Sequence, residues 1–265
     1  HFTVSTAVIR VLKQYAERQG VDFADLAASV GLTPAILGDD HARISARQFE
    51  RLWERIIAGG HEPHPGLQFG REMVRHFPGG SILFTLMINC PTIGEALAAF
   101  VRYHRIMSDA IQPRIHHDGP RVRLTWDLYR QGFRAHPVLS EALISTYYAI
   151  LTHLSQGRII PNAVHFTHPG PEDADAYRRV FNAPISFGAA ENALMVDAAA
   201  MRLEICLASQ SLCGILENHA AQVSDAIGRT NKWSLEVMQV IGGMVMKGSR
   251  PTIDAVARRL AVSRR

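Results

Sequence analysis

The spacing of apolar residues changes period in the middle of this chain, and that change restricts the possible folds. Up to about Met107, apolar residues recur every three or four positions, as on one face of a helix. Between Val122 and Tyr129, apolar residues at even positions alternate with polar residues at odd positions. This alternation predicts a half-buried strand, paired as an antiparallel hairpin with residues 110–116 across His117–Pro120. We therefore expect an α+β protein, largely helical, with a small and mostly antiparallel sheet.

The remaining elements follow from the same two periods and from capping and turn residues. We predict helices at residues 3–19, 22–30, 45–58, from 65 onward, 81–89, 91–107, 136–156 and 172–181. Further short strands are predicted at residues 162–167, 185–187 and 193–196. After about Met201 the pattern is helical again, with a long helix at 203–227, a break at Gly228–Asn231 and a dense apolar helix from Leu235 to Met246.

The C-terminal stretch, residues 250–265, combines a capped amphipathic helix with a concentration of positive charge. Thr252 or Asp254 can cap the helix, and an apolar stripe follows at helical spacing: Ile253, Val256, Ala257 and Leu260. Ser263 can cap a second helix after a tight turn, as in a helix-turn-helix. The stretch holds five arginines and one aspartate, so it carries the whole formal charge of +4. An ordinary amphipathic terminal helix is the alternative.

Several protein classes lack support in the sequence. The chain does not start with a charged segment followed by an apolar run, and its longest apolar run, Ile82–Ile88, is too short for a membrane span, so we expect a cytoplasmic protein. Three cysteines do not indicate a disulfide framework. Cys206 and Cys213 lie too far apart on one predicted helix to form a bridge, and Cys90 is expected to be buried. The histidines form no recognisable metal-ligand set and familiar catalytic motifs are missing, so we expect no enzyme, metal or cofactor.

A series of short motifs, in order along most of the chain, resembles one family. The motifs are Gly31-Leu-Thr-Pro34, Arg43-Ile44 with Arg51-Leu-Trp-Glu54, Pro91-Thr-Ile-Gly-Glu-Ala-Leu97, Arg102-Tyr103, Val164-His-Phe-Thr-His-Pro169, Tyr177-Arg-Arg-Val-Phe181, Pro184-Ile-Ser-Phe-Gly188 and the tail Pro251–Arg265. Together they resemble the AraC/XylS family of bacterial transcription activators, in the branch with an arabinose-binding-type N-terminal domain. The resemblance implies an effector-binding sensor domain at residues 1–204, dimerisation and linker helices at 205–249, and the start of a helix-turn-helix DNA-binding domain at 250–265.

The resemblance also implies the partners of the protein. They are a small-molecule effector of unknown identity, double-stranded DNA for the intact protein, and a second copy in a homodimer. Only the first part of the family's DNA-binding domain is present here, so we expect that this chain alone does not read DNA sequence. Ser263, Arg264 and Arg265 would lie in the first turn of the recognition helix. A stand-alone small-molecule-binding or protein-interaction module without DNA binding is the alternative.

The helix predicted at 203–227 has two interpretations. It packs on its own domain, or it pairs with a second copy as a dimer interface. We favour dimerisation, because the resemblance points that way and two-fold symmetry suits paired DNA half-sites.

Candidate effector contacts are aromatic residues near the predicted sheet, because small-molecule pockets are apolar with a few fixed polar groups. These aromatics are Phe84, Tyr103, Trp126, Tyr129, Tyr147 and Tyr148. Trp126 is the strongest candidate, since its indole N–H needs a partner on the inward face of a strand. Arg102 could bind a carboxylate from a largely apolar helix. The alternatives are core packing for each aromatic residue and, as the interpretation we favour for Arg102, a surface ion pair with a structural acid.

Overall fold

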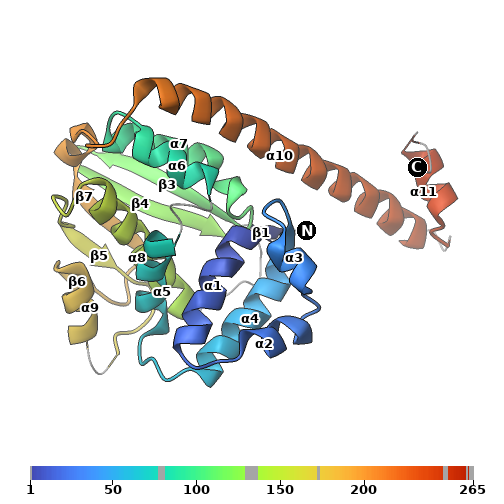
Figure 1. Ribbon diagram of the computed structural model, residues 1–265, viewed down its shortest axis with the longest axis horizontal. Coiled ribbons are helices and arrows are strands. Elements are labelled where there is room, and N and C mark those ends of the chain that lie inside the picture. The colour runs from blue at the N-terminus through green and yellow to red at the C-terminus, as the bar shows by residue number, and fades with distance from the viewer. Residues whose placement is uncertain are drawn as a thin grey trace.

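A five-stranded sheet lies on one side of the body, and helices pack on it and beside it (Figure 1). The computed structural model describes residues 2–76, 81–128, 137–171, 174–246, 250–260 and 262. The sheet order is β3-β4-β7-β5-β6, with the strands β3 Ile111–Asp118, β4 Arg121–Leu128, β5 Ala163–His165, β6 Ile185–Ser186 and β7 Ala193–Asp197. All pairings are antiparallel except that of β5 with β6. The predicted α+β class and the hairpin of β3 with β4 are confirmed.

The helices begin mostly where polar side chains can cap them. Ser5, Asp22, Thr33 and Thr92 each accept a hydrogen bond from a backbone N–H in the first turn that follows. Ser45 forms a reciprocal capping box with Gln48. In the described part of the chain, none of the helices has both the length and the apolar character that a bilayer span requires. The helices of the body are α1 Thr6–Arg18, α2 Phe23–Ser29, α3 Pro34–Gly38, α4 Ala46–Gly59, α5 Pro65–His76, α6 Ile82–Asn89, α7 Ile93–Tyr103, α8 Pro137–Leu154 and α9 Asp175–Phe181, with short 3-10 helices η1 His104–Ile106 and η2 Ala198–Arg202.

The first residues of the chain form a strand that the helical spacing did not predict. β1 Thr3–Ser5 pairs antiparallel with β2 Arg43–Ser45, so the helix predicted from residue 3 begins only at Thr6. Val4 also fits the helical spacing of the residues that follow, and residues 3–5 are too few to decide between the two periods. The pairing brings the starts of α1 and α4 together, since β1 leads directly into α1 and β2 into α4.

Two glycines allow α5 and α8 to pack at very short distance. Gly66 and Gly70 are four residues apart on α5, so they share one face. A Cβ atom at Gly70 would lie less than 3.0 Å from the side chain of Ser145 and the backbone nitrogen of Thr146 on α8. Ser145 Oγ donates a hydrogen bond of 2.6 Å to Leu67 O across the same contact. The glycines therefore fix the spacing of the two helices.

The C-terminal part contains one long helix where the sequence predicted two. α10 runs from Gln210 to Met246 without a break, so the break predicted at Gly228–Asn231 is wrong. A glycine inside a helix costs only about 1 kcal/mol, and neighbouring turns supply more than that. Gly228 instead provides space, because a Cβ there would lie 2.5 Å from Arg105 Nη1. α10 crosses the body over α6 and α7 and continues beyond it towards α11, Ile253–Arg259 (Figure 1).

Two smaller predictions near α10 also need correction. Cys206 lies before α10 begins, so it does not share a helix with Cys213. Cys213 lies instead beside buried Cys90, with 3.7 Å between the two Sγ atoms. The helix predicted at 91–107 ends at Tyr103 and tightens into η1, whose residues lie between α7 and β3.

Candidate functional site

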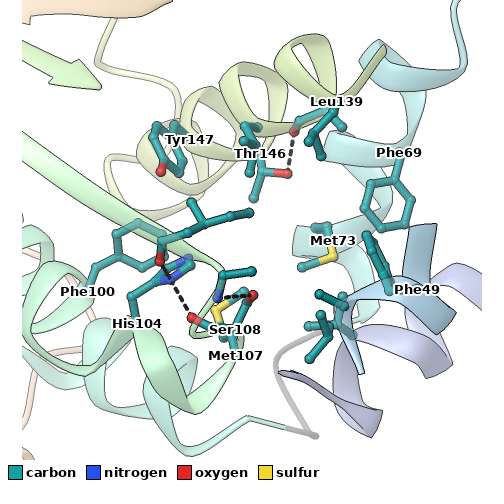
Figure 2. Close-up of a pocket in the computed structure, with 17 residues that line it drawn as sticks. Phe49, Phe69, Met73, Phe100, His104, Met107, Ser108, Leu139, Thr146 and Tyr147 are labelled. Atoms are coloured by element: carbon teal, nitrogen blue, oxygen red, sulfur yellow. Dashed lines mark hydrogen bonds between the residues drawn. The ribbon is translucent and has the colours of Figure 1, made fainter. Parts of the chain in front are cut away.

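A cavity of about 80 Å³ lies inside the body, where the N-terminal helices meet α7, η1, β3 and α8. Figure 2 shows Phe49, Phe69 and Met73 on one side of it and Phe100, His104 and Tyr147 on the other. Among the described residues that line it, none carries an acidic, lysine or arginine side chain. The rest of the lining is Val4, Val8, Ala46, Met107, Ser108, Ala110, Ile111, Leu139, Ala142, Leu143 and Thr146.

Helical spacing brings most of these side chains to the cavity. The lining residues of α8 follow the i, i+3, i+4, i+7, i+8 pattern of a single helix face: Leu139, Ala142, Leu143, Thr146 and Tyr147. On α5, Phe69 and Met73 are four residues apart and face α8 from the other side. Two of the cavity walls are therefore α5 and α8, whose distance is set by the contact at Gly70.

The hydroxyl group of Tyr147 is buried and has no hydrogen-bond partner among the described residues. The residue is only 4% exposed, and burial raises the pKa of the phenol above its usual value, so the group remains protonated. Phe100 and Trp126 hold the ring in edge-to-face contacts, with centroids 5.5 and 5.8 Å away. A buried hydroxyl without a partner is energetically unfavourable, so such groups mark sites where a further atom is expected to bind.

His104 provides the second buried polar group of the cavity wall. Its Nδ1 lies 3.2 Å from Ser108 O and 3.1 Å from Ile111 O. The pKa of His104 is lowered to about 4, mainly because the side chain is buried. The hydrogen bonds to the two carbonyl groups raise the pKa, and the charge of Arg43 lowers it. The imidazole is therefore neutral at pH 7, with its proton on Nδ1, the atom that donates to the carbonyls. Nε2 is left as an acceptor.

The segment that carries His104 is held from outside the cavity by Arg43. Its Nη1 donates to Ile106 O at 2.8 Å, and Nη2 donates to Arg105 O at 3.0 Å. Asp109 lies 3.9 Å from the same guanidinium group, and burial lowers the pKa of Arg43 while the charge of Asp109 raises it. These contacts tie η1 to β2, and they direct the positive charge of Arg43 to backbone oxygens on the far side of η1.

The same segment also contacts α10. η1 and α7 both pack against α10, and Arg102 Nη1 on α7 lies 2.8 Å from Glu217 Oε1 on α10. Tyr103 donates a hydrogen bond of 3.3 Å to the same carboxylate oxygen. Met107 lines the cavity and also an open cleft whose opposite wall is formed by Val223 and other residues of α10. A single short segment therefore separates the cavity from the long helix.

Comparison with known proteins decides the family. The model of the arabinose-binding domain of AraC transcription regulators, an N-terminal domain, matches residues 20–205, which is more than half of the chain. The chain belongs to this family. No curated protein matches the chain as a relative. The solved structures that resemble this chain include the transcriptional regulator CdpR from Pseudomonas aeruginosa. The TM-score is 0.59 and the sequence identity is 20%, and the match covers 96% of this chain and 75% of that chain. At that identity the likeness concerns the fold.

Within this AraC-type domain, the predicted ligand residues have different surroundings. Tyr147 lines the cavity, and Phe84 lines a small void of about 10 Å³ next to it, which also borders on Phe100. Trp126 lies behind Tyr147 and does not line the cavity. Tyr103 and Arg102 point to Glu217 on α10 instead. The side chain of Arg102 is 63% exposed, which matches the alternative of a surface ion pair with a structural acid.

Several lining residues of the AraC-type domain were not predicted as ligand contacts. Phe69, Met73, Phe100 and the η1 residue His104 lie on apolar helix faces, and this pattern is the same for core and pocket residues. The signal that could have identified the site is His104 itself, an ionisable residue at the end of an otherwise apolar helix face.

The residues predicted to bind DNA, Ser263, Arg264 and Arg265, lie outside the described residues. The helix before them is described: Thr252 Oγ1 accepts a hydrogen bond of 3.3 Å from Ala255 N at the start of α11. This contact is the predicted N-cap. In the part of the chain that the structure covers, no group of three or more His, Cys, Asp or Glu side chains is arranged to hold a metal ion.

Proposed function

We propose that this chain is the effector-binding and dimerisation portion of a cytoplasmic, non-enzymatic transcription regulator that binds DNA in response to a ligand. The proposal depends on one observation: the cavity wall formed by His104 and Met107 belongs to the segment that also holds α10. α10 leads to α11, the start of the expected helix-turn-helix. A ligand that favours one position of η1 would thereby favour one position of the DNA-binding domain.

The coupling requires that ligand binding change contacts in the joint with α10. The joint consists of the Arg102–Glu217 ion pair, the adjacent cysteine pair Cys90–Cys213 and the contact of Arg105 with Gly228. On the side of the body, Cys90 follows the last residue of α6, Arg102 lies on α7 and Arg105 lies on η1. A ligand that displaces η1 by a fraction of an ångström would change these contacts together, because a close-packed interior transmits small shifts.

We assign DNA binding to the intact protein and dimerisation to the region of α10. Arg258 and Arg259 in the last turn of α11 belong to the positively charged C-terminal stretch, which fits a double-stranded DNA partner. On α10, Leu212, Ile215 and Trp233 are apolar and exposed, as expected of a surface that a second copy covers. The proposed division is therefore a sensor domain at 1–204, dimerisation and linker helices at 205–249, and a DNA-binding domain from 250 onward.

A DNA-binding measurement on the full-length protein tests the regulatory role. An operator is selected from random DNA duplexes, and effectors are selected from a metabolite library by thermal shift. The affinity of the protein for the operator is then measured by fluorescence anisotropy with and without each effector. We expect at least a fivefold ligand-dependent change for the wild type, the lower end of ordinary allosteric coupling, roughly 1 kcal/mol. Ala142→Leu, which fills the cavity, should remove the change, whereas Ala149→Leu, on the same helix but not in the lining, should retain it. Equal affinity for a specific operator with and without every effector would contradict the proposal. Absence of any DNA sequence preference would favour a stand-alone ligand-binding module.

Sedimentation of this chain at micromolar concentration tests the proposed homodimer. We expect a species of twice the monomer mass of 29.3 kDa. Ile215→Lys should convert it to monomer, because it places a charge in the exposed apolar surface of α10. A monomer for the wild type would refute this interface.

A further inference from the structure

We infer that the cavity binds a small uncharged molecule, apolar except for one hydrogen-bonding oxygen, and that Tyr147 and His104 recognise that oxygen. The inference rests on the proposed function, in which the cavity is the effector site, and it adds the chemical class of the ligand. Neither the family nor the structural comparison names such a ligand for this chain.

The absence of charge in the lining excludes an ionised ligand. Among the described lining residues the only ionisable side chains are His104, which is neutral, and Tyr147, which is protonated. The nearby cation Arg43 already donates to backbone oxygens of Arg105 and Ile106 and faces Asp109. A carboxylate in the cavity would lose its hydration and gain no counter-ion, which is strongly unfavourable. Amino acids and fatty-acid anions therefore do not fit with their charged ends inside.

The unpartnered hydroxyl of Tyr147 selects for an oxygen atom in the ligand. This group is buried, it lacks a partner among the described residues, and it belongs to a side chain that lines the cavity. A ligand oxygen that reaches this hydroxyl, once the cavity wall moves, would accept the hydrogen bond that the protein leaves unmade. A hydrocarbon would leave the hydroxyl unsatisfied, and sites of this kind discriminate strongly against analogues that lack the polar group.

His104 complements Tyr147 at the same end of the cavity. The Phe100 ring contacts both, with its centroid 5.0 Å from the ring of His104 and 5.5 Å from that of Tyr147. Figure 2 shows the three side by side, opposite Phe69 and Met73. Because His104 has its proton on Nδ1, the remaining nitrogen is an acceptor, so a ligand hydroxyl could accept from Tyr147 and donate to His104. The apolar part of the ligand would then lie against the opposite wall.

The size of the cavity limits the ligand to about one ring with a short substituent. Its volume of about 80 Å³ is smaller than the roughly 150 Å³ of a protein cavity that accommodates benzene, so binding needs some movement of the wall. Met73 and Met107 line the cavity, and methionine side chains adapt easily to new shapes. Two voids of about 10 Å³ each border on Phe100, which also lines the cavity, so space for a larger ligand lies next to it.

Three probes with the same ring test the inference: benzyl alcohol, toluene and benzoate. Their dissociation constants are measured by ligand-observed NMR at pH 7.5 on the wild-type chain, on its Tyr147→Phe variant and on the matched control variant Tyr148→Phe. Tyr148 is the next residue on α8, packs on Phe181 and does not line the cavity. We expect benzyl alcohol to bind at least tenfold more tightly than benzoate. Tyr147→Phe should weaken benzyl alcohol about tenfold, to the level of toluene, and Tyr148→Phe should change nothing.

The outcomes separate this inference from the proposed function. In one contrary outcome, benzoate binds as tightly as benzyl alcohol, competes with toluene and loses its binding in Ala142→Leu. That result would overturn the uncharged ligand class and leave the cavity as the effector site. No binding of any probe to the wild type would overturn both. Loss of folding in Tyr147→Phe would also count against the inference, because removing an unpartnered hydroxyl should raise the melting temperature. His104→Asn provides a second check, since it removes the acceptor Nε2 and should weaken benzyl alcohol but not toluene.

Discussion

Substituting Gly70 by alanine tests how tightly the cavity walls are fixed. The new Cβ atom would lie less than 3.0 Å from Ser145 Oγ, Ser145 Cβ and the backbone nitrogen of Thr146, whereas ordinary contacts begin at 3.4 Å. Ser145 and Thr146 lie inside the α8 helix, so they cannot turn aside as the end of a flexible chain would. The two helices must therefore separate, on the order of 1 Å, to admit the methyl group.

Two losses and one gain determine the expected change in the free energy of unfolding. Overpacking of a close helix contact typically costs 1–3 kcal/mol. The separation also stretches the bond from Ser145 Oγ to Leu67 O, now 2.6 Å and buried, which contributes about 1 kcal/mol. Alanine has a better helix propensity than glycine and returns about 1 kcal/mol. We expect a net destabilisation of about 2 kcal/mol for Gly70→Ala.

Guanidinium unfolding followed by circular dichroism measures this change. Gly214→Ala is the matched control, because Gly214 is an exposed helical residue of α10 with nothing within 4 Å of its would-be Cβ. The control should be stabilised by about 0.5–1 kcal/mol, opposite in sign to Gly70→Ala. Equal effects of the two substitutions would refute the close contact of α5 and α8.

The other predictions concern titration and thiol reactivity. Since the pKa of His104 is about 4 in the folded protein and about 6.5 when unfolded, the unfolded state takes up the proton first, and stability is lost as pH falls from 6.5 towards 4. Between pH 7.5 and pH 5.0 the wild type should lose about 2 kcal/mol more than His104→Asn, measured by denaturant unfolding at both pH values; parallel losses would contradict the low pKa. Burial raises the pKa of Cys90 to about 12, so at pH 8 Ellman's reagent should modify Cys90 roughly a thousandfold more slowly than exposed Cys206, as followed by peptide mass spectrometry. Similar rates for the two cysteines would show that Cys90 is accessible.

The elements that the sequence predicted well are those with a strong local period. The hairpin of β3 and β4 was predicted because even and odd positions differ so clearly from Val122 onward. The long helix after Pro137 and the cap of α11 at Thr252 follow equally local rules. The break at Gly228 failed because propensity is a weak determinant within a 37-residue helix that packs against α6 and η1.

The candidate site was harder to predict than the fold because its parts come from distant segments. Val4 on β1 and Tyr147 on α8 line the same cavity, and no local pattern relates them. Tyr147 was predicted for its aromatic ring, whereas the structure gives importance to its unpartnered hydroxyl. Arg102 is a further example: its sequence context allowed a ligand contact as well as the favoured surface ion pair, and its position on α7 directs it to Glu217 on α10. Only tertiary packing distinguishes these cases.

Hydrogen exchange of the backbone amides of η1 and α10 tests most directly whether the cavity is coupled to the long helix. Ala142→Leu serves in place of a ligand, because its added carbons occupy the cavity of about 80 Å³. We expect altered exchange at residues 104–108 and at 210–228 relative to the wild type, and no change in either segment for Ala149→Leu. A change at 104–108 that leaves α10 untouched would contradict the coupling of cavity and DNA-binding domain.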